Sequence, residues 1–388
     1  MNPTAGAKPI YLDYQATTPI DPRVVEAMLP YLTTEFGNPS SSHCYGRAAA
    51  RAVDTARAQV ASLVGARSPK EIVFTSSGTE SNHLALTGAA EALRATGRGA
   101  HVITTTIEHP STQATCDRLA GLGFRVTRLP VGSDGRLDPA QLEQALRPDT
   151  VLVSAMHANN EIGTLQPLAE VAALTRRRHV LLHTDAAQSL ASVPVDVERL
   201  GVDLLTVVGH KMYAPKGVAA LYIRRGTPPL VPQLRGGGQE RGLRAATENV
   251  AGIVALGAAA AIAQSQRVAD GARALKQRER LRRELVDALP GLQVNGSLTY
   301  RLPGNLSLTI PHVTAEQMMA ATPDLAYSAG AACHTGRTAP SPVLTAIGLR
   351  PEQAARTIRL GVGRFTTDTE ITGAATRLIA AARQSGTP

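Results

Sequence analysis

Short apolar runs alternate with longer amphipathic segments over the first 225 residues of the chain. Strand-like runs rich in apolar residues occur at residues 71–76, 101–106, 125–131, 150–156, 180–185 and 204–208. Helix-like segments separate most of these runs, near residues 80–96, 109–122, 138–147 and 166–178. Strands that are apolar on both faces and alternate with helices predict a mostly parallel sheet with helices on both sides.

A further apolar run at residues 219–223 changes this picture. It follows Val208 too closely for a parallel crossover, which needs a dozen or more residues. We therefore expect this strand to pair antiparallel, which makes the sheet mixed.

The pattern changes after a stretch rich in Gly and Pro at residues 225–238. A long helical segment at about 249–289 follows, then strand-like runs at 305–310 and 357–362 and a closing helix from about Asp368. These elements predict a second, smaller unit. We place a large α/β domain at residues 15–260, and a small α+β domain at residues 1–14 and 261–388.

Composition excludes some classes of protein. The net charge of +9 and the pI near 9.8 come from scattered arginines, and only 3% of the residues are aromatic, so we expect no direct nucleic-acid partner. The three cysteines lack paired spacing, which argues for free thiols in a reducing compartment. The histidines are dispersed, so we expect no metal site.

Membrane association is not expected either. The longest apolar stretch, residues 251–263, is too short to span a bilayer, and residues 1–9 contain no apolar signal core. These features predict a cytoplasmic protein.

The candidate chemistry centres on Lys211 and Asp185. Only five lysines occur in the 388 residues, and Lys211 follows a predicted strand directly, in Gly209-His210-Lys211. Asp185 ends another predicted strand. A pyridoxal phosphate (PLP) enzyme needs a lysine to hold the aldehyde as a Schiff base and a carboxylate to keep the ring nitrogen protonated. The two residues supply both parts.

Other strand ends carry residues that suit the same cofactor. Gly78 and Thr79 open a predicted helix, whose free N–H groups would bind a phosphate, although a simple helix cap would have the same letters. His109 would stack on the ring and shuttle protons, or be a turn residue. One amide of the pair Asn159-Asn160 would donate to the ring oxygen, or lie in a turn, and Gln188 would reach that oxygen as well.

Cys333 lies in a stretch of small residues, at 328–342. A cysteine is by default a buried small apolar residue. Glycine and polar neighbours favour exposure here, and an accessible thiolate near a PLP site would be a nucleophile. Both interpretations stay open from the residues alone.

Several strings together resemble those of the NifS/IscS-type cysteine desulfurases and the related selenocysteine lyases. This group belongs to the class V aminotransferases, which are fold-type I PLP enzymes. The strings occur at residues 11–19, 36–40, 74–81, 157–163, 183–188, 209–211, 236–241 and 359–365. The resemblance implies a large, mixed, mostly parallel seven-stranded sheet domain and a smaller α+β domain.

The resemblance also implies a role for each matching residue. Lys211 would be the Schiff-base lysine, Asp185 the partner of the ring nitrogen, His109 the stacking acid and base, and Cys333 the sulfur-accepting nucleophile. The remaining contacts would be to the ring oxygen from Asn160 and Gln188, to the phosphate from Gly78, Thr79, His210 and the partner subunit's Thr247, and to the substrate carboxylate from Arg359 and Asn160. We therefore expect a homodimer that takes L-cysteine and passes persulfide sulfur to an acceptor protein, such as an iron–sulfur scaffold or a sulfur carrier.

Three departures from the desulfurase pattern bear on the substrate. Val208 stands where many desulfurases carry a phosphate-binding serine, and His334 follows the cysteine, as in the selenocysteine lyases. Ala214 and Ala246 replace glycines that are common in the family. A selenocysteine lyase, or another PLP carbon–sulfur lyase, is therefore the alternative to a cysteine desulfurase.

Overall fold

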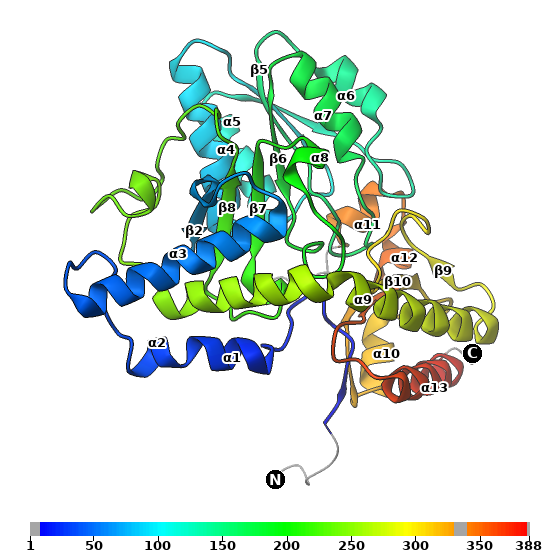
Figure 1. Ribbon diagram of the computed structural model, residues 1–388. Coiled ribbons are helices and arrows are strands. Elements are labelled where there is room, and N and C mark those ends of the chain that lie inside the picture. The colour runs from blue at the N-terminus through cyan, green and yellow to red at the C-terminus, as the bar shows by residue number, and fades with distance from the viewer. Residues whose placement is uncertain (1–7, 330–339, 386–388) are drawn as a thin grey trace.

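The computed structural model describes residues 8–329 and 340–385, and its largest element is a seven-stranded sheet (Figure 1). The strands lie in the order β2–β8–β7–β6–β5–β3–β4. Their bounds are β2 Ile72–Thr75, β3 His101–Thr105, β4 Arg125–Leu129, β5 Thr150–Ser154, β6 Leu181–Asp185, β7 Leu204–Val208 and β8 Ala219–Ile223. β8 runs antiparallel to both of its neighbours, and the other neighbouring pairs are parallel. The predicted mixed sheet and the antiparallel strand are confirmed.

Helices cover both faces of this sheet. One face carries α4 (Gly78–Ala95) and α5 (Pro110–Gly121), and the other carries α3 (Cys44–Val64), α6 (Pro139–Ala145), α7 (Leu168–Arg177), α8 (Val197–Leu200) and the first part of α9 (Val250–Ala288). Successive residues of a strand point to opposite faces. In β2, Ile72 and Phe74 therefore pack in the core on the α3 side, whereas Val73 packs in the core on the α4 side.

A second core lies beside the large sheet. Its four-stranded sheet has the order β12–β13–β10–β9, with the bounds β9 Gln293–Val294, β10 Asn305–Thr309, β12 Ser328–Ala329 and β13 Thr357–Gly361. The remaining elements near it are β1 (Ile10–Tyr11), which pairs with β11 (Leu325–Ala326), and the helices α10 (Ala315–Ala321), α11 (Pro342–Ala346), α12 (Pro351–Ala355) and α13 (Asp368–Ser385).

Helix α9 joins the two cores along its length (Figure 1). Ile253 and Leu256 pack in the core of the large sheet, whereas Leu281 and Leu285 pack in the second core. The predicted domain boundary at residues 260 and 261 falls inside this helix, and it stays a prediction.

The N-terminal helices were not predicted from the sequence. They are α1 (Pro22–Met28), α2 (Pro30–Thr33) and α3. The buried residues of α3 recur every three to four positions, as Ala49, Val53 and Ala56 do, so a helical pattern was present in the sequence and was missed. Its ends are also encoded locally, because the His43 side chain accepts a hydrogen bond from Gly46 N and Gly65 adopts a left-handed φ of 72°.

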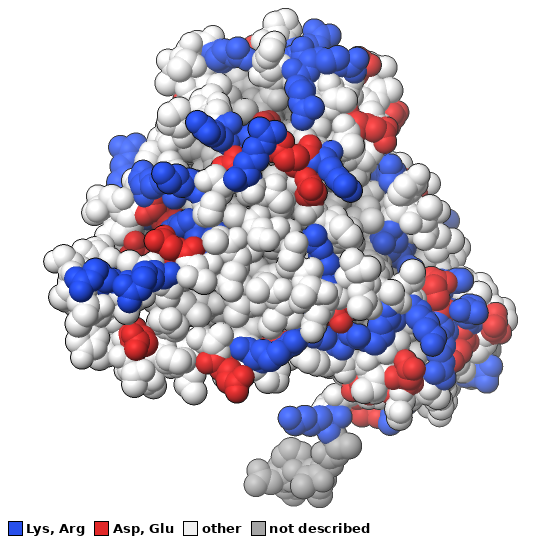
Figure 2. All heavy atoms as spheres, in the orientation of Figure 1, with Lys and Arg blue, Asp and Glu red and all other residues white. Residues whose placement is uncertain are grey.

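Charged side chains of both signs are interspersed on the face shown in Figure 2. None of the helices in the described parts of the chain is long and apolar enough to cross a membrane. The same residues include no group of three His, Cys, Asp or Glu that could hold a metal ion.

Candidate active site

A cavity of about 550 Å³ opens at the carboxyl ends of strands β2, β3, β5, β6 and β7. Ligands of open α/β sheets bind at this edge, where the loops after neighbouring strands meet. Nine of the predicted site residues line the cavity, namely Gly78, Thr79, His109, Asn160, Asp185, Gln188, His210, Lys211 and Arg359. The fold therefore brings together residues that are up to 281 positions apart in the sequence.

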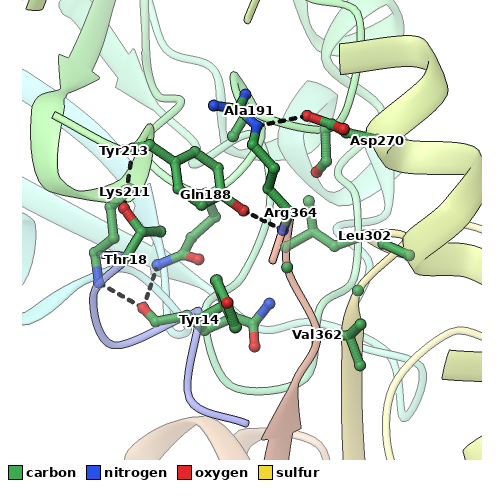
Figure 3. Close-up of a pocket in the computed structure, with 15 residues that line it drawn as sticks. Tyr14, Thr18, Gln188, Ala191, Lys211, Tyr213, Asp270, Leu302, Val362 and Arg364 are labelled. Atoms are coloured by element: carbon green, nitrogen blue, oxygen red, sulfur yellow. Dashed lines mark hydrogen bonds and ion pairs between the residues drawn. The ribbon is translucent and has the colours of Figure 1, made fainter. Parts of the chain in front are cut away.

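Lys211 ends the short helical turn η2 (Gly209–Lys211) that follows β7. Its Nζ donates hydrogen bonds to the carbonyl oxygens of Gln15, at 2.5 Å, and Ala16, at 2.6 Å. Figure 3 shows the Lys211 amine beside the Gln188 amide. Gln188 Nε2 donates to the same carbonyl of Gln15, at 3.0 Å. Burial lowers the pKa of the Lys211 amine to about 8. The neutral amine, which is the nucleophile in imine formation, is therefore more populated near neutral pH than for an exposed lysine.

Asp185 ends strand β6 and is 6% exposed. Its Oδ2 accepts a hydrogen bond from Asn82 Nδ2, at 2.8 Å, and its Oδ1 accepts one from Ala187 N, at 2.9 Å. Asn82 is itself oriented by Thr206 Oγ1, which donates to Asn82 Oδ1 at 2.7 Å. These donors hold the carboxylate in one orientation at the cavity wall.

His109 caps the N-terminus of helix α5. Its Nδ1 lies 2.8 Å from Ser111 Oγ and accepts from Ser111 N at 3.1 Å. Because Nδ1 accepts, Nε2 carries the proton in the neutral ring. Asn82 Nδ2 also donates to Ser111 Oγ, at 3.0 Å. One amide therefore orients both the Asp185 carboxylate and the serine that contacts His109.

The N-terminus of helix α4 forms one end of the cavity. Ser77 caps this helix by accepting from Glu80 N, at 3.1 Å. A Cβ on Gly78 would lie 2.6 Å from Val208 Cγ2, so only glycine lets the helix start this close to strand β7. The first N–H groups of a helix have no partner within the helix, and the positive end of its dipole favours an anion such as phosphate.

Arg359 lies on strand β13 and is already engaged in the structure. Its Nη2 donates to Asp13 Oδ1, at 2.9 Å, and to Ser328 Oγ, at 2.8 Å, while its Nη1 donates to the carbonyl oxygen of Asn160, at 3.2 Å. Its Nε is buried without a hydrogen-bond partner. A bidentate contact with a substrate carboxylate would use Nη2 together with either Nε or Nη1. Because Nη2 now donates to Asp13 and Ser328, the predicted grip requires one of these two hydrogen bonds to break.

The other two predicted residues are Thr247, which lies in a different pocket, and Cys333. Thr247 lines an adjoining pocket of about 230 Å³, together with Ala246 and Gly217. Ala246 has a φ of 101°, a conformation that glycine adopts without strain, and this agrees with the glycine that the resemblance implies at this position. Cys333 lies outside the described residues.

Several cavity residues were not predicted. Asn82 lies four positions after Gly78 on helix α4, and this spacing, which places side chains on one face of a helix, was the available signal. Gln15 and Ala16 line the cavity within a string that carries the resemblance, at residues 11–19. Lys216 also lines the cavity, and no local pattern distinguishes it.

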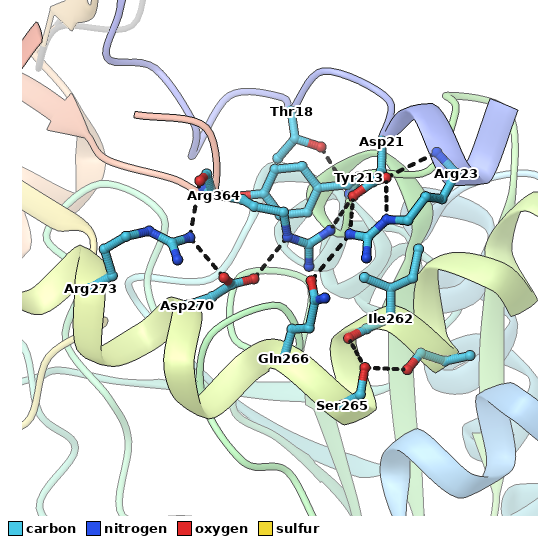
Figure 4. Close-up of polar contacts among 11 residues, drawn as sticks. Thr18, Asp21, Arg23, Tyr213, Ile262, Ser265, Gln266, Asp270, Arg273 and Arg364 are labelled. Atoms are coloured by element: carbon cyan, nitrogen blue, oxygen red, sulfur yellow. Dashed lines mark hydrogen bonds and ion pairs between the residues drawn. The ribbon is translucent and has the colours of Figure 1, made fainter. Parts of the chain in front are cut away.

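An ionic cluster around the buried Arg364 lies beside the Tyr213 ring (Figure 4). Arg364 donates from Nε to Asp270 and from Nη1 to Asp21, both at 2.8 Å, and its guanidinium carbon lies 4.2 Å from the centroid of the Tyr213 ring. The backbone N of Arg364 donates to the Tyr213 hydroxyl at 2.6 Å. Tyr213 follows Lys211 by two positions, and Arg364 follows Arg359 by five. The cluster therefore ties the loop after the lysine to the loop after the arginine of the cavity.

Replacing Arg364 by methionine should lower the free energy of unfolding by about 3 kcal/mol, because the buried carboxylate of Asp21 and the partly buried carboxylate of Asp270 would lose their shared cation. Urea denaturation of the two proteins measures the difference. Arg273, which is 42% exposed at its side chain and pairs with Asp270, is the matched control, and Arg273→Met should cost no more than about 1 kcal/mol. Equal losses in both variants would contradict the special role of the buried cation.

Comparison with known proteins places the chain in a family. The model of the aminotransferase class-V family matches residues 10–373. The chain is 50% identical over 365 residues to the cysteine desulfurase IscS of Anaeromyxobacter dehalogenans, covering 94% of this chain and 90% of that protein. The chain belongs to the cysteine desulfurase family of class-V aminotransferases. The resemblance predicted from the sequence strings is thereby confirmed.

Solved structures agree with this membership. A NifS-like protein superposes with a TM-score of 0.90 at 34% identity, over 97% of this chain and 100% of that chain. The structure of SspA in complex with cysteine superposes with a TM-score of 0.81 at 35% identity, over 92% of this chain and 99% of that chain. The predicted fold class is confirmed.

Class-V aminotransferases depend on PLP, and the cavity of this chain fits that cofactor. It offers an amine of lowered pKa for the aldehyde, a buried carboxylate for the ring nitrogen and a helix start for the phosphate. Ser77, Gly78 and Thr79 line the cavity, so the start of the helix borders the space that the cofactor would occupy.

Proposed function

We propose that the chain is a PLP-dependent cysteine desulfurase, which converts L-cysteine to L-alanine and leaves the substrate sulfur as a persulfide on Cys333. The observation that carries the proposal is the placement of the Lys211 amine and the Asp185 carboxylate in one cavity with Arg359. The 50% identity to the desulfurase IscS of Anaeromyxobacter dehalogenans supports the same reaction.

The residues of the cavity suit proton movement at an amino acid. When bound, PLP supplies an electron-accepting ring that weakens the bonds at the alpha carbon. With a pKa of about 8, a larger fraction of Lys211 is neutral near neutral pH than of an ordinary lysine. The neutral amine can take up the alpha proton, and the resulting ammonium can release it again. Asp185, held by Asn82 and Ala187, would sustain a positive charge on the ring nitrogen. His109 would stack on the ring and carry protons.

The remaining PLP contacts are proposed from the family pattern. Gly78, Thr79 and His210 would hold the phosphate from this subunit, while Asn160 and Gln188 would contact the ring oxygen. Gln188 now donates to Gln15 O, so this role requires the amide to turn. The carboxylate of L-cysteine would displace Asp13 or Ser328 from one donor of Arg359.

The sulfur step belongs to Cys333. Its thiolate attacks the sulfur of the substrate, the new S–S bond forms as the carbon–sulfur bond breaks, and the carbon takes up a proton before L-alanine leaves. This role follows from thiolate chemistry and from the family pattern, since the residue lies outside the described part of the chain.

We also propose a homodimer in which the partner's Thr247 completes the phosphate site. The pocket that contains Thr247 adjoins the cavity and shares Ser76, Gly217 and Val218 with it, so this region of one subunit lies close to a cofactor site. The persulfide would pass to an acceptor protein, such as an iron–sulfur scaffold or a sulfur carrier. A cytoplasmic location stays a prediction from the sequence.

A selenocysteine lyase is the second candidate. The observation that favours it is Val208, whose side chain packs against Gly78 and offers no hydroxyl at the phosphate end of the cavity. The sequence Cys333-His334 points the same way.

Product analysis tests the proposal. With L-cysteine and a reducing thiol, the protein should release L-alanine and sulfide in equal amounts, and mass spectrometry without the reductant should find one extra sulfur on the peptide that contains Cys333. Faster turnover of L-selenocysteine, with no persulfide from L-cysteine, would favour the lyase. Pyruvate with ammonia, or a keto acid, would exclude both activities in favour of another PLP reaction.

A further inference from the structure

The phosphate end of the cavity is short of positive charge. A phosphate monoester carries a charge of about −1.5 to −2 near neutral pH, and the N-terminus of a helix supplies only about +0.5. The groups proposed for the phosphate, on Gly78, Thr79 and the partner's Thr247, are uncharged. Most of the phosphate charge is therefore left without a counter-charge from these groups.

His210 does not supply the missing charge. Burial, and then the positive charges of Lys211 and Lys216, lower the pKa of its ring to about 4. Its Nδ1 lies 3.1 Å from Thr17 Oγ1. Near neutral pH the ring is thus a neutral hydrogen-bonding group rather than a cation.

The arginine of the adjoining pocket is also accounted for. Arg244 lines the adjoining pocket, but its Nε donates to Glu80 Oε1 at 2.9 Å. Glu80 in turn accepts from Ser76, whose backbone N lies 2.8 Å from its Oε2. This pair is neutral as a whole, so it does not compensate for a phosphate.

Lys216 lies in the loop between η2 and β8 and lines the same cavity as Ser76, Gly78 and Thr79. It is exposed, and no residue in the described ranges forms a hydrogen bond or an ion pair with its side chain. Its charge nevertheless acts on the cavity, because it lowers the pKa of both His210 and Lys211. A lysine in this position is a cation without a counter-ion at the rim of the site.

We propose that Lys216 supplies the positive charge that balances the cofactor phosphate, as a phosphate-binding residue additional to the family's contacts. This inference rests on the proposed function, because it assumes that PLP occupies the cavity. The long side chain reaches from an exposed loop, so the ammonium stays hydrated and acts as a point charge on the phosphate. The charge of Lys216 contributes a larger share of the phosphate binding because Val208, which packs against Gly78, has no hydroxyl to donate to the phosphate.

The test compares PLP with pyridoxal, which lacks the phosphate. In equilibrium titrations of protein stripped of cofactor, Lys216→Met should weaken PLP binding by about tenfold, the size expected for one partly exposed charge pair. Binding of pyridoxal should not change. Lys216→Arg, which keeps the charge, should bind PLP within about twofold of the wild type, and Lys70→Met, at an exposed lysine remote from the cavity, should match the wild type.

Salt gives a second readout. The difference between wild type and Lys216→Met in PLP affinity should shrink as the ionic strength rises, because an exposed pair is screened. Unchanged PLP affinity in Lys216→Met, or an equal loss for PLP and pyridoxal, would overturn the role of Lys216 while leaving the proposed function intact. Failure of the wild-type protein to bind PLP at all would instead overturn the proposed function.

Discussion

Turnover of L-cysteine should fall by on the order of 10⁴-fold or more when Lys211 is replaced by alanine. The reason is that one side chain both holds the cofactor aldehyde and moves the alpha proton in the proposed reaction. The structure adds that the amine has a fixed place, on the carbonyl oxygens of Gln15 and Ala16, and a pKa lowered to about 8. Sulfide and alanine release measure the loss.

Because the sequence has only five lysines, the lysine that binds the cofactor can be identified directly. Borohydride reduction of the wild-type protein, followed by peptide mass mapping, should find the cofactor on Lys211 and on none of the other four lysines of the sequence. Lys70→Ala is the matched control and should keep full activity. Added methylamine should restore part of the activity of Lys211→Ala, a rescue that a misfolded variant would not show. Cofactor trapped on another lysine would refute the assignment.

Replacing Cys333 by alanine should lower sulfide release by several orders of magnitude, as in other enzymes that lose their nucleophile. The visible absorbance of bound cofactor should persist, since Lys211 and Asp185 are unchanged. The persulfide seen by mass spectrometry should disappear. This combination separates the sulfur step from cofactor binding.

The other two cysteines are the controls for this experiment. Cys116 is fully buried, and burial raises the pKa of its thiol to about 12, so it has almost no thiolate near neutral pH. Cys44 is exposed, and neither residue lines the cavity. Cys44→Ala and Cys116→Ala should retain sulfide release. Retained release in Cys333→Ala, or its loss in Cys44→Ala, would remove Cys333 as the sulfur acceptor.

Much of the fold was predictable from the order of apolar runs. The seven strands of the large sheet follow the predicted runs closely, and β8 is antiparallel because its connection to β7 is short. Helix α3 was missed although its buried residues, such as Ala49, Val53 and Ala56, recur at the three- to four-residue spacing of a helix. The signal for this helix was therefore local and available in the sequence.

The site was predicted where one strand end presents one reactive side chain. Lys211 and Asp185 follow buried strands directly, and neighbouring parallel strands bring their carboxyl ends together at one edge. Asn82, which orients Asp185 across 103 positions, had only a helix spacing to reveal it. Lys216 had no signal at all, because an exposed loop lysine is common on any soluble protein.

The seven strands of the large sheet, the lysine and the carboxylate of the cavity, and the family could all be predicted from the residues alone. Three features could be found only in the folded chain: Asp13 holds Arg359 across 346 positions, the carbonyl of Ala16 accepts from the Lys211 amine, and Arg364 joins the two loops next to the cavity. The difference comes from the separation of these partners along the chain. Local propensity and periodicity act over a turn or a strand, whereas these partners meet only after the two cores have packed along one long helix.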